Sequence, residues 1–323
     1  MTYLLSILVA SLAVTSTLAA ALDGSTLQAR GLGCGQAHNK GIGKVKYFSI
    51  MSGGVSRDFA VYLPSGYNQN SATPMILSFH GHGKDMDYQS TLSRFKEPGV
   101  NPNMIAVFPQ GLIPSGSTER CWEGAPYCTT GVSDKVFVTD LLTYMRNNYC
   151  VDDHKIYVSG KSIGGGLVDL LACSPGHGGD FAAFAMDAAA LYTEADGSGS
   201  ICNPARRPMP ILELHGTDDT TAKYDGDKAK GLPPIRDVLS KWATRNSCTG
   251  SPPAVTIDQD QGNGVHYTQY DCAGKSSVVV GFKVDHQGHW WISTSSNGDN
   301  KGKRAPIDAS TKMMAFFNAN TKP

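Results

Sequence analysis

Excess charge of either sign is missing from this 323-residue sequence, which has 28 Lys and Arg residues against 28 Asp and Glu residues. Such a balance creates no net field toward nucleic acid or an anionic membrane, so we expect neither as a partner. Repeats, low-complexity tracts and internal linkers are also missing, as is any N-x-S/T sequon. These absences favour one large domain that acts on a neutral or weakly charged substrate. We expect it to be a monomer.

The N-terminus lacks an apolar run long enough to cross a bilayer, because the run from Leu4 to Val14 is too short. It is followed by three small residues, Ala19 to Ala21, which are typical of a cleavage site for export. We therefore expect residues 1–21 to be a signal peptide. Residues 31–323 are then expected to form a single exported domain.

All eight cysteines lie after this segment, and an even number in an exported chain predicts four disulfides. Eight cysteines allow about 105 pairings, and proximity in the sequence is the only guide among them. It favours these pairs: Cys121–Cys128, Cys248–Cys272, Cys150–Cys173 and Cys34–Cys202.

Short apolar runs alternate with longer segments of helical pattern along most of the chain. Two antiparallel strands, Val45 to Ile50 and Phe59 to Leu63, are expected at the sheet edge. Buried parallel strands are expected at Met75–Phe79, Met104–Phe108, Ile156–Val158, Phe181–Met186, Ile211–Leu214 and Val278–Val284, and helices at Asp134–Asn147, Ile163–Ala172, Ile235–Arg245 and Pro306–Asn318. This alternation predicts an α/β three-layer sandwich with a mostly parallel central sheet, whose chemistry lies at the carboxyl ends of the strands.

A G-x-S-x-G pattern spans Gly160 to Gly164 with Ser162 at its centre. It follows an expected strand and opens an expected helix, which is the context of a nucleophile elbow in the α/β-hydrolase fold. A tight turn of this kind presents the serine oxygen to substrate. The alternative is a glycine-rich helix start in which Ser162 only caps the helix.

A serine hydroxyl needs a base that is oriented by an acid, and in this fold the chain order is serine, acid, histidine. The loop after the strand at Ile211 offers Asp218 and Asp219, of which we favour Asp219. The loop after the last strand offers His286 and His289. We favour His289 because the preceding glycine allows a tight loop and two tryptophans follow.

The tetrahedral intermediate needs backbone N–H donors for its negative oxygen. One is expected from Ile163, the residue after the nucleophile. The second is expected from the loop His80-Gly81-His82-Gly83, with His82 favoured and Gly81 as the alternative.

With these segments placed, the chain resembles fungal feruloyl esterases, in the carbohydrate esterase group that includes acetylxylan esterases and relatives of polyhydroxybutyrate depolymerases. The resemblance covers nearly the whole predicted domain. It implies a triad of Ser162, Asp219 and His289, with no metal or cofactor. Lys161 inside the elbow departs from the pattern expected of the group, as does Trp291 in place of proline.

The resemblance implies hydrolysis of ferulate or related hydroxycinnamate esters on feruloylated plant cell-wall polysaccharide or its oligosaccharides. Acetylxylan esterase or polyhydroxybutyrate depolymerase activity on the same triad is the alternative. Aromatic walls for the acyl group are expected from Trp122, Tyr127, Trp290 and Trp291, although burial in the core is an equal alternative for them.

Two hypotheses of another class are kept open. In a metallohydrolase, His80, His82 and Asp85 would bind a metal ion together with His286 and His289. A catalytically inactive relative would bind carbohydrate without reaction at the serine.

Overall fold

The computed structural model describes residues 32–38, 41–192, 202–248, 257–260 and 263–323. The predicted signal peptide lies outside the described residues. In the part of the chain that is described, ten strands form one sheet in the order β1-β2-β4-β3-β5-β6-β7-β10-β9-β8. The six strands from β4 to β10 in this order pair in parallel, and the two strands at either edge pair antiparallel. The predicted mostly parallel sheet is confirmed.

The edge hairpin and the central strands follow the apolar runs of the sequence. The strands are β1 (Val45–Ser52), β2 (Val55–Tyr62), β3 (Thr73–Phe79), β4 (Ile105–Pro109), β5 (Val151–Lys161), β6 (Ala183–Asp187), β7 (Ile211–Gly216), β8 (Ile257–Asp260), β9 (Val265–Cys272) and β10 (Lys275–Val284). β4 and β6 are buried at every position, as expected of parallel strands that are covered on both faces.

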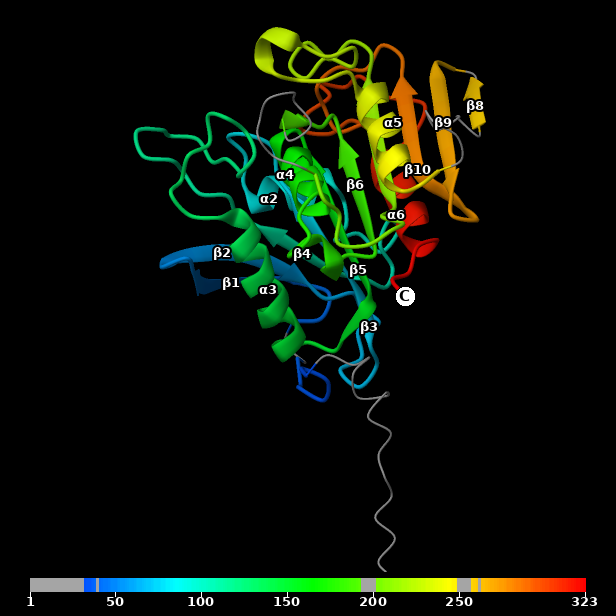
Figure 1. The fold of residues 1–323 in the computed structure, drawn as a ribbon. Coiled ribbons are helices and arrows are strands. Elements are labelled where there is room, and N and C mark those ends of the chain that lie inside the picture. Colours follow the sequence, from blue (N-terminus) through cyan, green and yellow to red (C-terminus); the bar gives the residue numbers. More distant parts are fainter. Residues whose placement is uncertain (1–31, 39–40, 193–201, 249–256, 261–262) are drawn as a thin grey trace, which may run out of the picture.

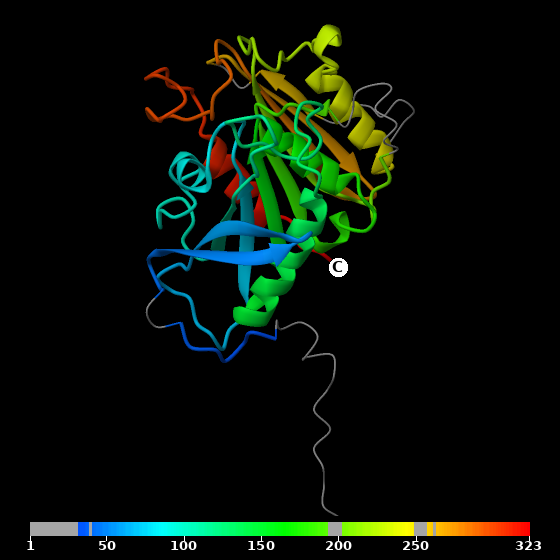
Figure 2. The same cartoon turned by 90° about the vertical axis from the view of Figure 1, so that its left-hand side faces the viewer.

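Helices cover both faces of the sheet and create two hydrophobic cores (Figures 1 and 2). They are α2 (Met86–Leu92), α3 (Asp134–Asn148), α4 (Ile163–Ala172), α5 (Ile235–Arg245) and α6 (Ala309–Asn318). One core contains the apolar side chains of α3, α4 and α5, and the other contains those of α2 and α6. The result is the predicted three-layer sandwich, and it directs the carboxyl ends of the parallel strands to one edge, where the polar loops lie.

Four disulfides are present, and two of the predicted pairings are wrong. Cys121–Cys128 and Cys248–Cys272 are bonded as expected, whereas Cys34 is bonded to Cys150 and Cys173 to Cys202. The prediction of Cys34–Cys202 and Cys150–Cys173 assumed that cysteines on either side of one strand–turn–helix unit meet.

Backbone docking explains the observed pairs. The N–H of Gly33 donates to the carbonyl of Arg146 at the end of α3, which brings Cys34 beside Cys150. The N–H of Asn203 donates to the carbonyl of Cys173 at the end of α4, which brings Cys202 beside Cys173. Four disulfides are typical of a protein that folds in an oxidising compartment. Among the described residues, no helix is long and apolar enough to cross a membrane.

Candidate active site

Ser162 lies at the sharp turn between β5 and α4, in a backbone conformation that non-glycine residues rarely adopt. Its φ is 57° and its ψ is −123°. A Cβ on Gly160 would lie 2.3 Å from the backbone of Gly164, and a Cβ on Gly164 would lie 2.5 Å from the carbonyl oxygen of Phe79. The two glycines of the elbow are therefore required by close backbone contacts, and the turn holds the serine side chain at the edge of the sheet.

Two loops that follow β7 and β10 bring an imidazole and a carboxylate to this serine. The hydroxyl of Ser162 lies 2.8 Å from Nε2 of His289, and Nδ1 of His289 lies 2.7 Å from Oδ2 of Asp219. Oδ1 of Asp219 accepts the N–H groups of Thr221 and Ala222, both at 2.8 Å. The structure thus brings together the three residues that the sequence pointed to.

The alternatives for acid and base lie outside this arrangement. The side chain of Asp218 is 58% exposed and that of His286 is 89% exposed, and the two face each other at 3.8 Å. Gly216 lets the two loops meet, because a Cβ there would lie 2.1 Å from the carbonyl oxygen of Gln287. Of the two candidates in each loop, only Asp219 and His289 therefore point toward Ser162.

A buried pair behind Asp219, which was not among the predicted site residues, extends the hydrogen-bonded chain into the sheet. Nδ1 of His215 lies 2.8 Å from Oε1 of Glu213, and its Nε2 lies 3.2 Å from Oδ2 of Asp219 and 2.6 Å from the carbonyl oxygen of Ala222. Both ring nitrogens of His215 therefore face acceptors, which favours the doubly protonated, charged ring. The one signal in the sequence that could have revealed this pair is Glu213, a glutamate inside the apolar strand β7.

The protonation states follow from these contacts. Burial would lower the pKa of His215, but its hydrogen bonds to Asp219 and Glu213 outweigh burial and raise it to about 10. Burial would raise the pKa of Asp219, but hydrogen bonds from His215 and His289 hold it well below its usual range. Burial lowers the pKa of His289, against the opposing hydrogen bond to Asp219. At neutral pH the site therefore holds a carboxylate next to a neutral imidazole, which suits a general base.

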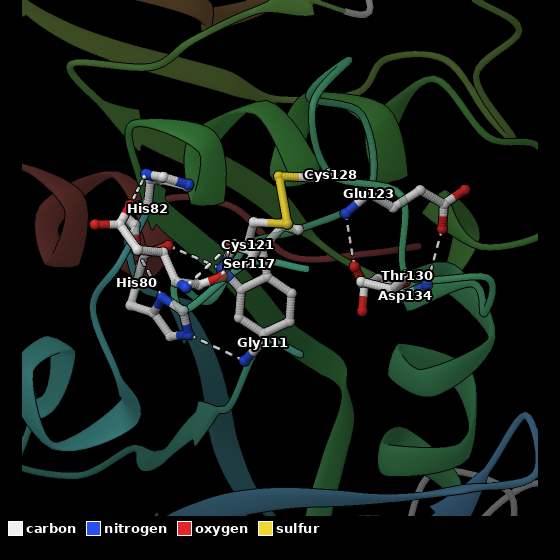
Figure 3. The surroundings of a disulfide bond; sticks show 12 residues. His80, His82, Gly111, Ser117, Cys121, Glu123, Cys128, Thr130 and Asp134 are labelled. Carbon is white, nitrogen blue, oxygen red and sulfur yellow. Dashed lines mark hydrogen bonds and ion pairs between the residues drawn. A yellow bond between two sulfur atoms is a disulfide. The ribbon is translucent and has the colours of Figure 1, made fainter. Parts of the chain in front are cut away.

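The loop after β3 lies beside Ser162 and is supported by hydrogen bonds within the structure. A Cβ on Gly81 would lie 3.4 Å from Cβ of Ser162, which places this loop against the elbow. The side chain of His80 is fully buried, and its Nε2 accepts the N–H of Gly111 at 3.0 Å (Figure 3). The indole N–H of Trp122 donates to the carbonyl of His80 at 2.8 Å. His82 and Ile163 thus occupy the segments on either side of Ser162 from which oxyanion donors are expected.

Aromatic side chains gather at the rim of this loop. The ring of Tyr127, which is 51% exposed, packs edge-on against the ring of His82 at 5.3 Å and against that of Tyr192 at 6.1 Å. The disulfide Cys121–Cys128 closes the segment that carries Tyr127 (Figure 3). Trp290, next to His289 in the sequence, is half-buried, and its indole N–H donates to Oε1 of Gln287 at 2.9 Å. Tyr192 was not among the predicted substrate contacts.

Two of the four aromatic residues predicted to contact substrate are core residues instead, so this part of the prediction is corrected. Trp122 and Trp291 are both 0% exposed. Trp122 packs against the rings of Phe79 and His80, and the indole N–H of Trp291 donates to Ser310 at the start of α6. Because both indoles are used in packing and internal hydrogen bonds, they support the loops of the site and offer no surface to a ligand.

The residues of the metallohydrolase hypothesis do not converge. Among the described residues, no group of three or more His, Cys, Asp or Glu side chains is arranged to hold a metal ion. His80 is bonded to backbone groups, Asp85 caps α2 by accepting the N–H of Tyr88, and His82 pairs with Glu119 at 2.9 Å. This dispersal disfavours the hypothesis.

Comparison with known sequences finds esterases. The chain is 29% identical over 203 residues to feruloyl esterase B of Piromyces equi, covering 61% of this chain and 37% of that protein. It is 25% identical over 278 residues to the bifunctional acetylxylan esterase/xylanase XynS20E of Neocallimastix patriciarum, covering 80% and 37%. It is 28% identical over 278 residues to feruloyl esterase D of Neurospora crassa, covering 83% and 86%. The chain thus spans little more than a third of the first two relatives. These matches confirm the predicted resemblance.

Comparison with solved structures supports the fold. An acetyl xylan esterase from Aspergillus awamori matches with a TM-score of 0.59 at 14% identity, covering 85% of this chain and 99% of that one. A CE1 ferulic acid esterase from Anaeromyces mucronatus, in complex with ferulic acid, matches with a TM-score of 0.51 at 16% identity, covering 88% and 94%. No family model matches the chain. The chain has the fold of the α/β serine hydrolases.

Proposed function

We propose that this chain, a relative of the feruloyl and acetylxylan esterases, is a serine carboxylic ester hydrolase that forms an acyl-enzyme. The observation that carries the proposal is the pair of short contacts from Ser162 to His289 and from His289 to Asp219, at 2.8 and 2.7 Å. Nε2 of His289 takes the hydroxyl proton as Ser162 attacks the ester carbonyl. The same proton then goes to the departing alcohol, and water repeats the sequence on the acyl-enzyme.

The oxyanion formed in each half is proposed to accept the N–H of Ile163 and one N–H of the loop after β3. His82 is the favoured donor of that loop, and Gly81 is the alternative. The close approach of Gly81 to Ser162, where an added Cβ would lie 3.4 Å from Cβ of Ser162, supports this assignment, because it puts the loop within reach of the carbonyl that the serine attacks. Asp219 keeps the proton of His289 on Nδ1, so that Nε2 is free to accept.

The proposed substrates are esters of ferulate or related hydroxycinnamates on plant cell-wall polysaccharide or its oligosaccharides. The names of the relatives support this class. The exposed ring of Tyr127, next to the loop after β3, also supports it, because an aromatic acyl group would find a flat apolar partner there. Tyr192 and Trp290 are proposed to add to this wall. Acetylxylan esterase activity is the second candidate, since two of the matched proteins carry that name.

We further propose that the protein is secreted and acts as a monomer on this extracellular substrate. The four disulfides support folding in an oxidising compartment. The predicted signal peptide over residues 1–21 supports export.

A panel of esters tests the function. The purified protein is given methyl ferulate, methyl caffeate, methyl sinapate, acetylated xylan and a hydroxybutyrate oligomer, and S162A is assayed beside it. We expect turnover of the hydroxycinnamates, and a loss of at least about 10⁴-fold in S162A. Hydrolysis of acetylated xylan alone would overturn the hydroxycinnamate assignment, and undiminished turnover by S162A would overturn the serine mechanism.

A further inference from the structure

Lys161, which departs from the resemblance, connects the nucleophile to the loop that carries the base. It is the last residue of β5 and directly precedes Ser162. Its side chain is 9% exposed, and its Nζ lies 3.0 Å from Oδ2 of Asp299 and 3.3 Å from the carbonyl oxygen of His289, to which it donates. The lysine therefore contacts the backbone of the base itself, 128 residues further along the chain.

Asp299 joins the same loop to a third element. Its Oδ2 accepts the N–H of Trp291 at 3.1 Å, and its Oδ1 accepts the hydroxyl of Tyr88 on α2. The carboxylate is 7% exposed, and the neighbouring Lys161 helps to hold its pKa below the usual range although burial acts the other way. A single buried ion pair thus connects β5, α2 and the segment from His289 to Asp299.

We propose that the Lys161–Asp299 ion pair is a positioning device that holds the backbone of His289 at the nucleophile and keeps a positive charge beside the base. The proposal rests on the serine esterase function above. Lys161 touches no reacting atom; it acts through His289. This role explains a lysine in the elbow, because a cation at the residue before Ser162 reaches the backbone of His289 and the carboxylate of Asp299.

The charge has a consequence that a purely mechanical contact lacks. The charged groups that act on the imidazole of His289 are Asp219, Lys161 and His215; Asp219 raises its pKa, whereas Lys161 and His215 lower it, in addition to the effect of burial. Removal of the lysine charge should therefore raise the pKa of His289, and it leaves the negative Asp299 unpaired, which acts in the same direction. Removal of the Asp299 charge leaves the lysine cation unpaired and should lower the pKa of His289.

The test measures the rate at which a fluorophosphonate labels Ser162 between about pH 4 and pH 8, with hydrolysis of p-nitrophenyl acetate as the second readout. The labelling rate follows the neutral fraction of His289 and does not depend on the natural acyl group. In K161M we expect the midpoint of the acid limb to rise by roughly half to one pH unit, and in D299N to fall by a similar amount. The double variant should lie between them.

Two controls make the comparison specific. K161R keeps the charge and should keep the midpoint of the wild-type protein. K155M removes a lysine from near the middle of β5, where the side chain is 44% exposed and pairs with Asp152, and should change neither the midpoint nor the rate.

Midpoints that stay at the wild-type value, or that shift in the same direction in K161M and D299N, would overturn the proposal. If K161M fails to fold by circular dichroism, the downward shift in D299N decides the question. A wild-type protein that is not labelled would overturn the esterase mechanism and this inference with it. Labelling without hydrolysis of methyl ferulate, methyl caffeate or methyl sinapate would overturn the substrate assignment alone.

Discussion

The His80-Gly81 pair directly after β3 and the His215-Gly216 pair at the end of β7 are equal in sequence and in burial, yet one histidine ring is neutral and the other is positively charged. His80 and His215 are both 0% exposed. Burial lowers the pKa of His80 to about 4. One ring nitrogen accepts the N–H of Gly111, which suits the neutral ring, and no carboxylate is bonded to the ring to oppose the effect of burial. His215 lies between Glu213 and Asp219, and its pKa is raised to about 10.

The difference shows that the neighbours of a buried ring, more than its depth, decide whether the ring is charged. The neutral ring of His80 supports the loop after β3 through its hydrogen bond to Gly111. The charged ring of His215 supports Asp219. The same dipeptide at the ends of two parallel strands therefore supports the two halves of the proposed mechanism by different means.

Loss of the Asp219 carboxylate, which pairs with His215 and has no counterpart at His80, should have the largest effect on activity. In D219N the amide replaces the carboxylate that orients His289 and pairs with His215, so we expect kcat/KM for methyl ferulate to fall about 10⁴-fold. D218N is the matched control, since that carboxylate is 58% exposed and points away from Ser162. A similar loss in both variants would contradict the assignment of Asp219 as the acid.

Replacement of each ring by leucine should separate the two histidines in stability. H215L leaves Glu213 and Asp219 buried without their cation, and we expect the free energy of unfolding to fall by about 3 to 5 kcal/mol. H80L leaves the N–H of Gly111 without its acceptor, for which about 1 to 3 kcal/mol is expected. Urea unfolding at pH 7 measures both values. A smaller loss in H215L than in H80L would contradict the charged state of His215.

Titration should show the smallest but most direct difference. By NMR, the ring of His80 should gain its proton only near pH 4, and the ring of His215 should keep its proton until about pH 10. Unfolded histidine titrates near pH 6.5, so the contribution of His80 to stability is lost as pH falls from about 6.5 toward 4. The contribution of His215 is present below about pH 6.5 and is lost as pH rises toward 10. If both rings titrate at the same pH, the two histidines do not differ in charge state, contrary to this prediction.

The sequence predicted the elements whose burial shows as continuous apolar runs. These elements are the strands β3, β4, β5, β6, β7 and β10 and the helices α3 to α6. The strand β9 mixes buried and half-buried residues without a regular alternation, and α2 has seven residues with Gln89 and Ser90 among its buried ones, so neither has an apolar pattern that could be recognised. Elements that bury polar groups are therefore the ones that composition and periodicity miss.

The same limit applies to the site. Ser162, Asp219 and His289 could be found because chain order and loop position constrain a triad. The disulfides of Cys34 and Cys173 depend on which distant segment docks beside each, and no local pattern reports this. Lys161 stood out as an unusual residue, but its partner Asp299 lies in a loop whose path only the folded chain defines. Burial of Trp122 and Trp291 likewise depends on tertiary packing.

The left-handed backbone at Ser162 restricts which residues can carry the nucleophile there. A threonine would supply the same hydroxyl, but its branched Cβ is poorly tolerated at a φ of 57°, so the turn would have to relax and the oxygen would move away from His289. A cysteine has an unbranched Cβ and would retain the direction of its reactive atom. At this position the shape of the side chain near the backbone matters as much as the functional group at its end.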